Sequence, residues 1–176
     1  MWLVDATVEQ LQRWDRSASL QLNQALRYAA IRRLFQAVSW LGNGILWYAL
    51  MLALLARYGA EAALPVLHMI FVGAVGTGAY AMVKRGTSRP RPYQALQSIA
   101  AGARALDAYS FPSGHALHAV AFSLVTCWHY PALGVVLAPF VLLTAISRMV
   151  LGLHYPSDVL AGAALGALIA AASFRI

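Results

Sequence analysis

The chain has 176 residues, of which 61% are hydrophobic and only 11% are charged, and its formal net charge is +7. A soluble domain is about half apolar and about a quarter charged, so this composition indicates a membrane protein of one domain, residues 1–176. The basic excess does not indicate nucleic-acid binding, because no such motif is present and the aromatic residues lie within apolar runs. Basic side chains at membrane ends, or around an anionic substrate, explain the charge better.

Residues 1–36 are predicted to form an amphipathic helical arm that lies in the membrane interface. Apolar residues recur three or four positions apart among polar ones, at Leu11, Trp14, Ala18, Leu22, Ala25 and Ala29. This spacing is typical of a helix with one apolar face rather than of a membrane span. The alternative is a solvated arm without a function.

Five apolar stretches follow, each close to the roughly 20 residues that a spanning helix needs. They cover residues 37–56, 64–83, 113–130, 132–150 and 156–174. Glycine and alanine crowd the second and fifth stretches, where we expect them to let helices pack closely. The predicted fold class is therefore all-α, an integral membrane bundle of about five transmembrane helices plus the N-terminal arm.

The longest polar stretch, residues 84–112, is predicted to be an active-site loop. A connection of this length is usually functional or disordered. It holds five basic residues against one acid, Asp107: Lys84, Arg85, Arg89, Arg91 and Arg104. Because successive spans alternate in direction, this loop is expected to share one membrane face with residues 112–115 and 147–158.

These three polar clusters suit a phosphate group. Lys84, Arg91 and Arg148 offer a point charge and two planar forks that match phosphate oxygens. Ser113 and Gly114 begin a helix, where free backbone N–H groups and the positive end of the helix dipole form an anion cradle.

Two histidines stand near this predicted cradle. His154 precedes Asp158 by four residues, and a carboxylate that accepts one ring N–H leaves the other nitrogen free to attack phosphorus. His115 is placed to protonate the leaving oxygen. Carboxylates are few here, so we predict neither a metal nor another cofactor. Taken alone, Asp158 is also a suitable helix cap.

Supporting roles are predicted for three further residues. His118 shares a helix face with His115, and it either supports the site from behind or only packs. Pro112 and Ser147 flank the phosphate-binding positions and are candidates for the same role. His68, within the second apolar stretch, is predicted to pack or to bridge helices.

The same residues resemble the three motifs of the type 2 phosphatidic acid phosphatase superfamily, which also includes the vanadium haloperoxidases. All three motifs are complete and in order between residues 84 and 158. The motif K-x6-R-P is matched by Lys84, Arg91 and Pro92, P-S-G-H by Pro112, Ser113, Gly114 and His115, and S-R-x5-H-x3-D by Ser147, Arg148, His154 and Asp158.

The resemblance implies a membrane lipid phosphatase in which His154 forms a phosphohistidine and Asp158 holds His154. His115 would protonate the leaving group and then activate water. The phosphoryl oxygens would be bound by Lys84, Arg91, Arg148, Ser113 and the Gly114 N–H. Membrane members usually have six spans, and here the arm takes the place of the first.

The expected partners are membrane lipids and a lipid phosphate substrate, with no nucleic acid and no obligate protein partner. Candidate substrates are undecaprenyl pyrophosphate, phosphatidylglycerol phosphate, phosphatidate or a lipid A phosphate. One alternative is a phosphotransferase that passes the phosphoryl group to a second lipid. A non-enzymatic transporter is a further alternative, but it has no need of the complete set of His115, His154 and Asp158.

Two arguments disagree about the membrane side of the site. The active-site face carries eight basic residues besides the three proposed phosphate ligands, whereas the opposite face carries only Arg57 and Arg175. The positive-inside rule then places the site in the cytoplasm. The resemblance implies the periplasmic side of a bacterial inner membrane, and this is the side that we expect.

Overall fold

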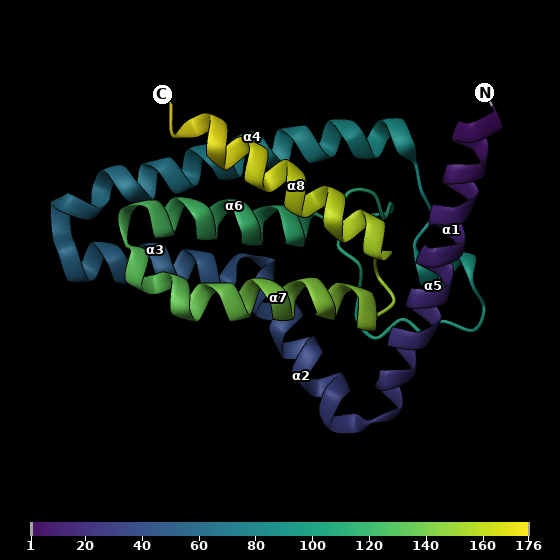
Figure 1. The fold of residues 1–176 in the computed structure, drawn as a ribbon. Helices are drawn as coiled ribbons and strands as arrows, with labels where there is room; N and C mark the ends of the chain where they lie inside the picture. The colour runs from purple at the N-terminus through teal and green to yellow at the C-terminus, as the bar shows by residue number, and fades with distance from the viewer. Residues whose placement is uncertain (1, 176) are drawn as a thin grey trace.

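The structure is a computed structural model that describes residues 2–175, with side chains from residue 6 onward. Within this part of the chain, helices account for all regular structure, and no strand is formed. The helices are α1 (Trp2–Asn23), α2 (Ala29–Trp40), α3 (Leu46–Tyr58), α4 (Ala63–Thr87), α5 (Pro92–Ala95), α6 (Gly114–His129), α7 (Gly134–Val150) and α8 (Pro156–Ser173) (Figure 1). The all-α prediction is confirmed.

Five of these helices form the bundle. Helices α3, α4, α7 and α8 run lengthwise around α6, which packs against α4, α7 and α8 (Figure 1). Glycines bring α8 close to α6: a Cβ added at Gly162 or Gly166 would lie 2.3 Å from a carbonyl oxygen of α6 or of the residue before it. The prediction that small residues allow close helix packing is confirmed for these two positions.

The outer surface of the bundle is apolar. Large hydrophobic side chains are exposed on the bundle helices, including Leu52, Leu64, Val135 and Leu160. By length and hydropathy, three described helical stretches are able to cross a membrane: residues 29–95, which include α3 and α4, then 131–150 and 156–173. Such a surface needs lipid rather than water around it, so the chain is a membrane protein.

The first predicted span, residues 37–56, is not one continuous helix. It is interrupted between α2 and α3 by a π-helical segment, Leu41–Ile45. Asn43 and Gly44 leave helical geometry there, and Gly44 has a φ of 111°, which is a conformation that glycine adopts without strain. The sequence Gly-Asn-Gly therefore turns an asparagine out of the helix toward the interior.

Helix α1 stands across one end of the bundle (Figure 1). Its buried face is polar and includes Asp15, Ser19 and Asn23, whereas Val8, Leu11 and Trp14 are each 47% exposed. The predicted arm of residues 1–36 is helical but is not one helix, because the 3-10 turn Gln24–Arg27 separates α1 from α2. Of its predicted apolar positions, Leu11 and Trp14 face away from the protein, whereas Leu22 packs against a buried cluster. A helix that lies in a membrane interface exposes apolar side chains as Leu11 and Trp14 do. The position of the arm in the membrane interface stays a prediction.

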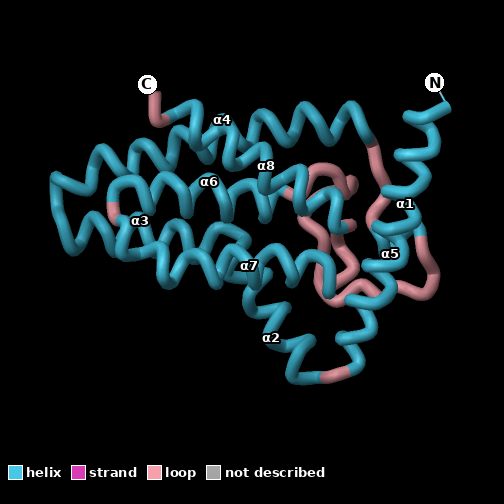
Figure 2. The backbone as a smooth tube through the Cα atoms, in the orientation of Figure 1, coloured by secondary structure: helices cyan, strands magenta, loops and turns pink. Residues whose placement is uncertain are grey.

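Most of the irregular backbone gathers at the same end as α1 (Figure 2). It comprises residues 88–113, apart from the short α5, and the turn 151–155 between α7 and α8. The ends of four bundle helices therefore meet α1 and two loops, and the candidate site lies there.

Candidate active site

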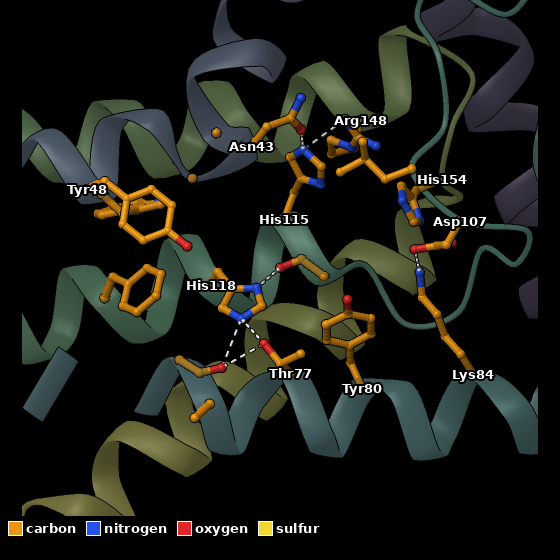
Figure 3. Close-up of a pocket in the computed structure, with 18 of the residues that line it drawn as sticks. Asn43, Tyr48, Thr77, Tyr80, Lys84, Asp107, His115, His118, Arg148 and His154 are labelled. Atoms are coloured by element: carbon orange, nitrogen blue, oxygen red, sulfur yellow. Dashed lines mark hydrogen bonds and ion pairs between the residues drawn. The ribbon is translucent and has the colours of Figure 1, made fainter. Parts of the chain in front are cut away.

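A cavity of about 680 Å³ opens between the loops and the bundle (Figure 3). Its polar end is lined by Lys84, Arg91, Gly114, His115, Arg148 and His154. It continues between apolar side chains of α3, α4 and α6, including Met51, Ile70 and Phe122. The three sequence clusters thus supply residues to one cavity, which combines a cationic end with an apolar channel.

The ring of His154 is buried and has a defined tautomer. Its Nδ1 lies 2.7 Å from the carbonyl oxygen of Ser110. Because a carbonyl oxygen only accepts, Nδ1 carries the proton and Nε2 keeps its lone pair. Nε2 lies 3.2 Å from Nη1 of Arg91, on the cavity side. Burial, and then the positive charges of Arg148, Arg91 and Lys84, lower the pKa of His154 well below 6.5, so the ring is neutral.

Asp158 does not hold this ring as the sequence predicts. Its Oδ2 lies 3.8 Å from Nδ1 of His154 and accepts instead the N–H of Tyr155 at 2.7 Å. Its Oδ1 accepts a hydrogen bond from Nη1 of Arg89 at 2.6 Å. The carbonyl of Ser110 occupies the position nearest Nδ1, which leaves Asp158 to cap the start of α8. Asp158 therefore acts on the backbone beside His154 rather than on its ring.

Arg148 is buried beside the two histidines. Its Nη1 donates to Oγ of Ser39 at 2.5 Å and lies 3.4 Å from Nε2 of His115. Its Nε has no hydrogen-bond partner among the described residues. An unpaired buried donor costs on the order of 1–3 kcal/mol, more when charged. Arg148 also lines the cavity, so its guanidinium adds positive charge to the polar end.

Lys84 and Arg91 share one acid, Asp107, and Figure 3 shows its pairing with Lys84. The two carboxylate oxygens lie 2.5 Å from Nζ of Lys84 and 2.6 Å from Nη2 of Arg91. Burial raises the pKa of Asp107, but its hydrogen bonds and charge interactions with Lys84 and Arg91 outweigh this, so the net pKa is below the ordinary value. A carboxylate thus stands beside two of the three cationic residues that are predicted to bind phosphate.

His115 is held by a residue that sequence reasoning missed. Its Nε2 hydrogen-bonds Oδ1 of Asn43, which reaches it from the interrupted helix (Figure 3). An amide oxygen only accepts, so Nε2 carries a proton at the cavity. The available signal was Gly-Asn-Gly within an apolar stretch, where a polar, helix-breaking triplet has no role in spanning.

The predicted anion cradle is only half open to the cavity. Ser113 is buried, its N–H donates to the carbonyl of Asp158 at 3.0 Å, and its hydroxyl accepts the N–H of Ala116 at 3.4 Å. Gly114 does line the cavity. Ser113 therefore caps α6 and ties it to α8, which differs from the predicted contact with phosphate.

Of the predicted supporting residues, only His118 lines the cavity. His118 joins α6 to α4, with Nδ1 2.9 Å from the carbonyl of Gly114 and Nε2 3.2 Å from Oγ1 of Thr77. Ser147 and Pro112 are buried outside the cavity lining. His68 bonds to side chains of α6 and α8, which confirms the prediction that it bridges helices.

Comparisons with known proteins agree with this geometry. A family model described as the PAP2 superfamily matches residues 62–176. The chain is 33% identical to undecaprenyl-diphosphatase BcrC of Bacillus subtilis over 132 residues, which are 74% of this chain and 68% of that protein. It is 41% identical over 92 residues to the decaprenylphosphoryl-5-phosphoribose phosphatase of Mycobacterium tuberculosis, but this match spans only 51% of the chain and 49% of that relative.

Two solved structures share the fold with a TM-score of 0.78 each. One is the transmembrane PAP2-type phosphatidylglycerolphosphate phosphatase from Bacillus subtilis, at 22% identity, with 94% of this chain and 85% of that chain covered. The other is LpxE from Aquifex aeolicus, at 24% identity, with 90% and 93% covered. At these identities the likeness shows the fold alone.

Proposed function

Because the chain belongs to the PAP2 superfamily, we propose that it is a membrane enzyme that hydrolyses a lipid phosphate or diphosphate through a phosphohistidine on His154. One observation carries the proposal. A buried, neutral histidine whose unprotonated Nε2 accepts from Arg91 at 3.2 Å lines a cavity that also holds Lys84 and Arg148. A nucleophile beside three cations is what attack on an anionic phosphorus requires.

In the first proposed step, Nε2 of His154 attacks phosphorus, and the bond from phosphorus to the leaving oxygen breaks. His115, protonated on both ring nitrogens, gives its Nε2 proton to that oxygen and is left as a neutral ring with a lone pair on Nε2. In the second step His115 takes a proton from water, the water oxygen bonds to phosphorus, and the phosphorus–nitrogen bond breaks to release phosphate. Arg148, Lys84 and Arg91, which all line the cavity, bind the phosphoryl oxygens.

The proposal includes no metal ion. Three cationic side chains supply the positive charge that a metal would otherwise bring to the phosphoryl group. The described histidine, cysteine and acidic side chains form no group of three or more arranged to hold a metal. Turnover is therefore expected to persist in excess chelator, and loss of turnover that magnesium or zinc restores would contradict this part of the proposal.

A polyprenyl chain is the favoured lipid. The apolar continuation of the cavity, along Met51, Ile70 and Phe122, suits a long hydrocarbon tail next to a phosphate. The two curated relatives described above are named for undecaprenyl and decaprenyl substrates. Phosphatidylglycerol phosphate and phosphatidate present the same phosphate on another tail and are the alternatives. We propose a bacterial inner membrane with the site on the periplasmic side.

Phosphate release by purified protein in detergent tests the function. The panel contains undecaprenyl diphosphate, undecaprenyl phosphate, phosphatidylglycerol phosphate and phosphatidate, and we expect the highest kcat/KM on a polyprenyl substrate. The His154→Ala protein should keep its helical content and release no phosphate above background, because the nucleophile is gone. Its alkali-quenched sample should also lack the phosphohistidine that the unsubstituted protein forms. Near-normal release by His154→Ala would refute the covalent mechanism.

A further inference from the structure

Helix α1 places one buried carboxylate against the catalytic loops. Asp15 is only 1% exposed, although it lies on the arm outside the bundle. Its Oδ1 accepts the N–H of Ser157 at 2.9 Å, and its Oδ2 accepts both Nη2 of Arg89 at 2.8 Å and the hydroxyl of Ser157. A buried carboxylate with three donors is held firmly, so α1 has one defined position relative to the start of α8.

Arg89 extends this contact toward the reacting groups. Its other terminal nitrogen, Nη1, donates to Oδ1 of Asp158 at 2.6 Å and to Oγ of Ser157 at 2.9 Å. Its guanidinium also lies over the ring of Tyr155, 4.0 Å from the centroid. Arg89 thus joins Asp15 to Tyr155, Ser157 and Asp158, which all lie within four positions after His154.

A second contact of α1 holds the other side of the site. Asn23 accepts the N–H of Ala100 at 2.9 Å and donates to the carbonyls of Ala100 and Val150 at 2.9 and 3.0 Å. The arm therefore ties the loop of residues 88–113 to both ends of the turn that carries His154. None of these bonds is needed to anchor a helix in a lipid interface.

We infer that Asp15 is a positioning residue of the active site, which acts through Arg89 and Ser157 to hold the His154 turn in line with the phosphate-binding cations. The inference rests on the proposed phosphatase function. It makes the arm a part of the catalytic structure, and it explains why an interfacial helix buries a charged residue, which is costly unless the charge is paired.

The test compares Asp15→Asn with Glu9→Gln. Both remove one negative charge from α1, but Glu9 is exposed and, among the described side chains, pairs with the exposed Arg13 alone, at 3.5 Å. Purified proteins are assayed for kcat, KM and the inhibition constant of vanadate, which adopts the five-coordinate geometry of the transferring phosphoryl group. For Asp15→Asn we expect kcat to fall roughly 10- to 100-fold and the inhibition constant of vanadate to rise by the same factor. Misplacement of a catalytic group such as His154 by about 1 Å has effects of this size.

Vanadate distinguishes positioning from a merely structural role. If Asp15→Asn only unfolds part of the sample, kcat falls but the vanadate constant of the remaining active molecules stays at the original value, and this result would overturn the inference. Asp15→Glu keeps a carboxylate and should bring kcat and the vanadate inhibition constant part of the way back to their original values. Glu9→Gln should match the unsubstituted protein in both. Phosphate release by His154→Ala equal to that of the unsubstituted protein would refute the phosphatase proposal instead.

Discussion

The proton positions on the two cavity histidines determine which roles they are able to take. Ser110 accepts from Nδ1 of His154, and Asn43 accepts from Nε2 of His115. One ring therefore presents a lone pair and the other presents a proton. A nucleophile and an acid of the same residue type are distinguished here by their hydrogen-bond partners alone.

The pH profile should reflect the lowered pKa of His154. Protonation removes the lone pair, and an unperturbed histidine is half protonated at pH 6.5. Because burial and the three cations hold this pKa well below 6.5, the free enzyme should keep its nucleophile as the pH falls through that value. We expect kcat/KM, corrected for the ionisation of the substrate, not to fall as the pH is lowered from about 8 to 6.5. An acid limb centred at or above pH 6.5 would contradict the assignment.

Asp107 should compete with phosphate for Lys84 and Arg91. With its pKa below the ordinary value, the carboxylate is charged throughout the neutral range and is lost as a partner only in acid. Asp107→Asn should therefore strengthen product inhibition by inorganic phosphate, lowering its inhibition constant by roughly two- to tenfold, as expected for removal of a like charge from an anion site. Glu61→Gln, at the opposite end of the bundle, is the matched control. Weaker inhibition in Asp107→Asn would show that the carboxylate supports phosphate binding.

At the scale of the helices, the contact between α6 and α8 should be sensitive to one methyl group. Alanine at Gly166 would place Cβ 2.3 Å from the carbonyl oxygen of Leu117 on α6. Because that oxygen belongs to a helical backbone, the helices must separate, at a cost of about 1–3 kcal/mol of unfolding free energy. Gly78→Ala is the control, since nothing lies within 4 Å of the added Cβ. Thermal unfolding in detergent should show a lower Tm only for Gly166→Ala.

The helices were predictable because their signals are local. Long apolar stretches indicate spans, and alternation of direction brings Lys84, His115, Arg148 and His154 to one end. Motif spacing could not reveal that Ser110 rather than Asp158 lies nearest Nδ1 of His154. That contact depends on the path of an irregular loop, which leaves no periodic pattern in the sequence.

The break between α2 and α3 was missed for a related reason. Mean apolarity over residues 37–56 is high enough to predict a span, and a short Gly-Asn-Gly triplet changes it little. The contacts of Asp15 were also beyond prediction, because they join residues more than 70 positions apart. An amphipathic pattern indicates that a helix has two faces, but not that the polar face binds the catalytic loops.

At the scale of the whole molecule, the membrane side of the site remains a proposal with a direct test. Gln97 is exposed on the loop that covers the site. A cysteine at this position, in a Cys127→Ser background that removes the one native thiol, reports the compartment that the loop faces. We expect a membrane-impermeant thiol reagent to label it in intact spheroplasts. Labelling only after lysis would place the site in the cytoplasm, as the basic residues suggest.

The far end of the bundle has a practical consequence for fusion proteins. Helix α8 starts beside the cavity and carries the chain to the other end, where the C-terminus lies (Figure 1). A reporter domain fused behind Arg175 is therefore delivered to the compartment opposite the one that receives the released phosphate. With the site on the proposed periplasmic side, a C-terminal fluorescent tag that matures inside the cell would mark an enzyme whose chemistry happens outside, and its signal has to be interpreted with that inversion.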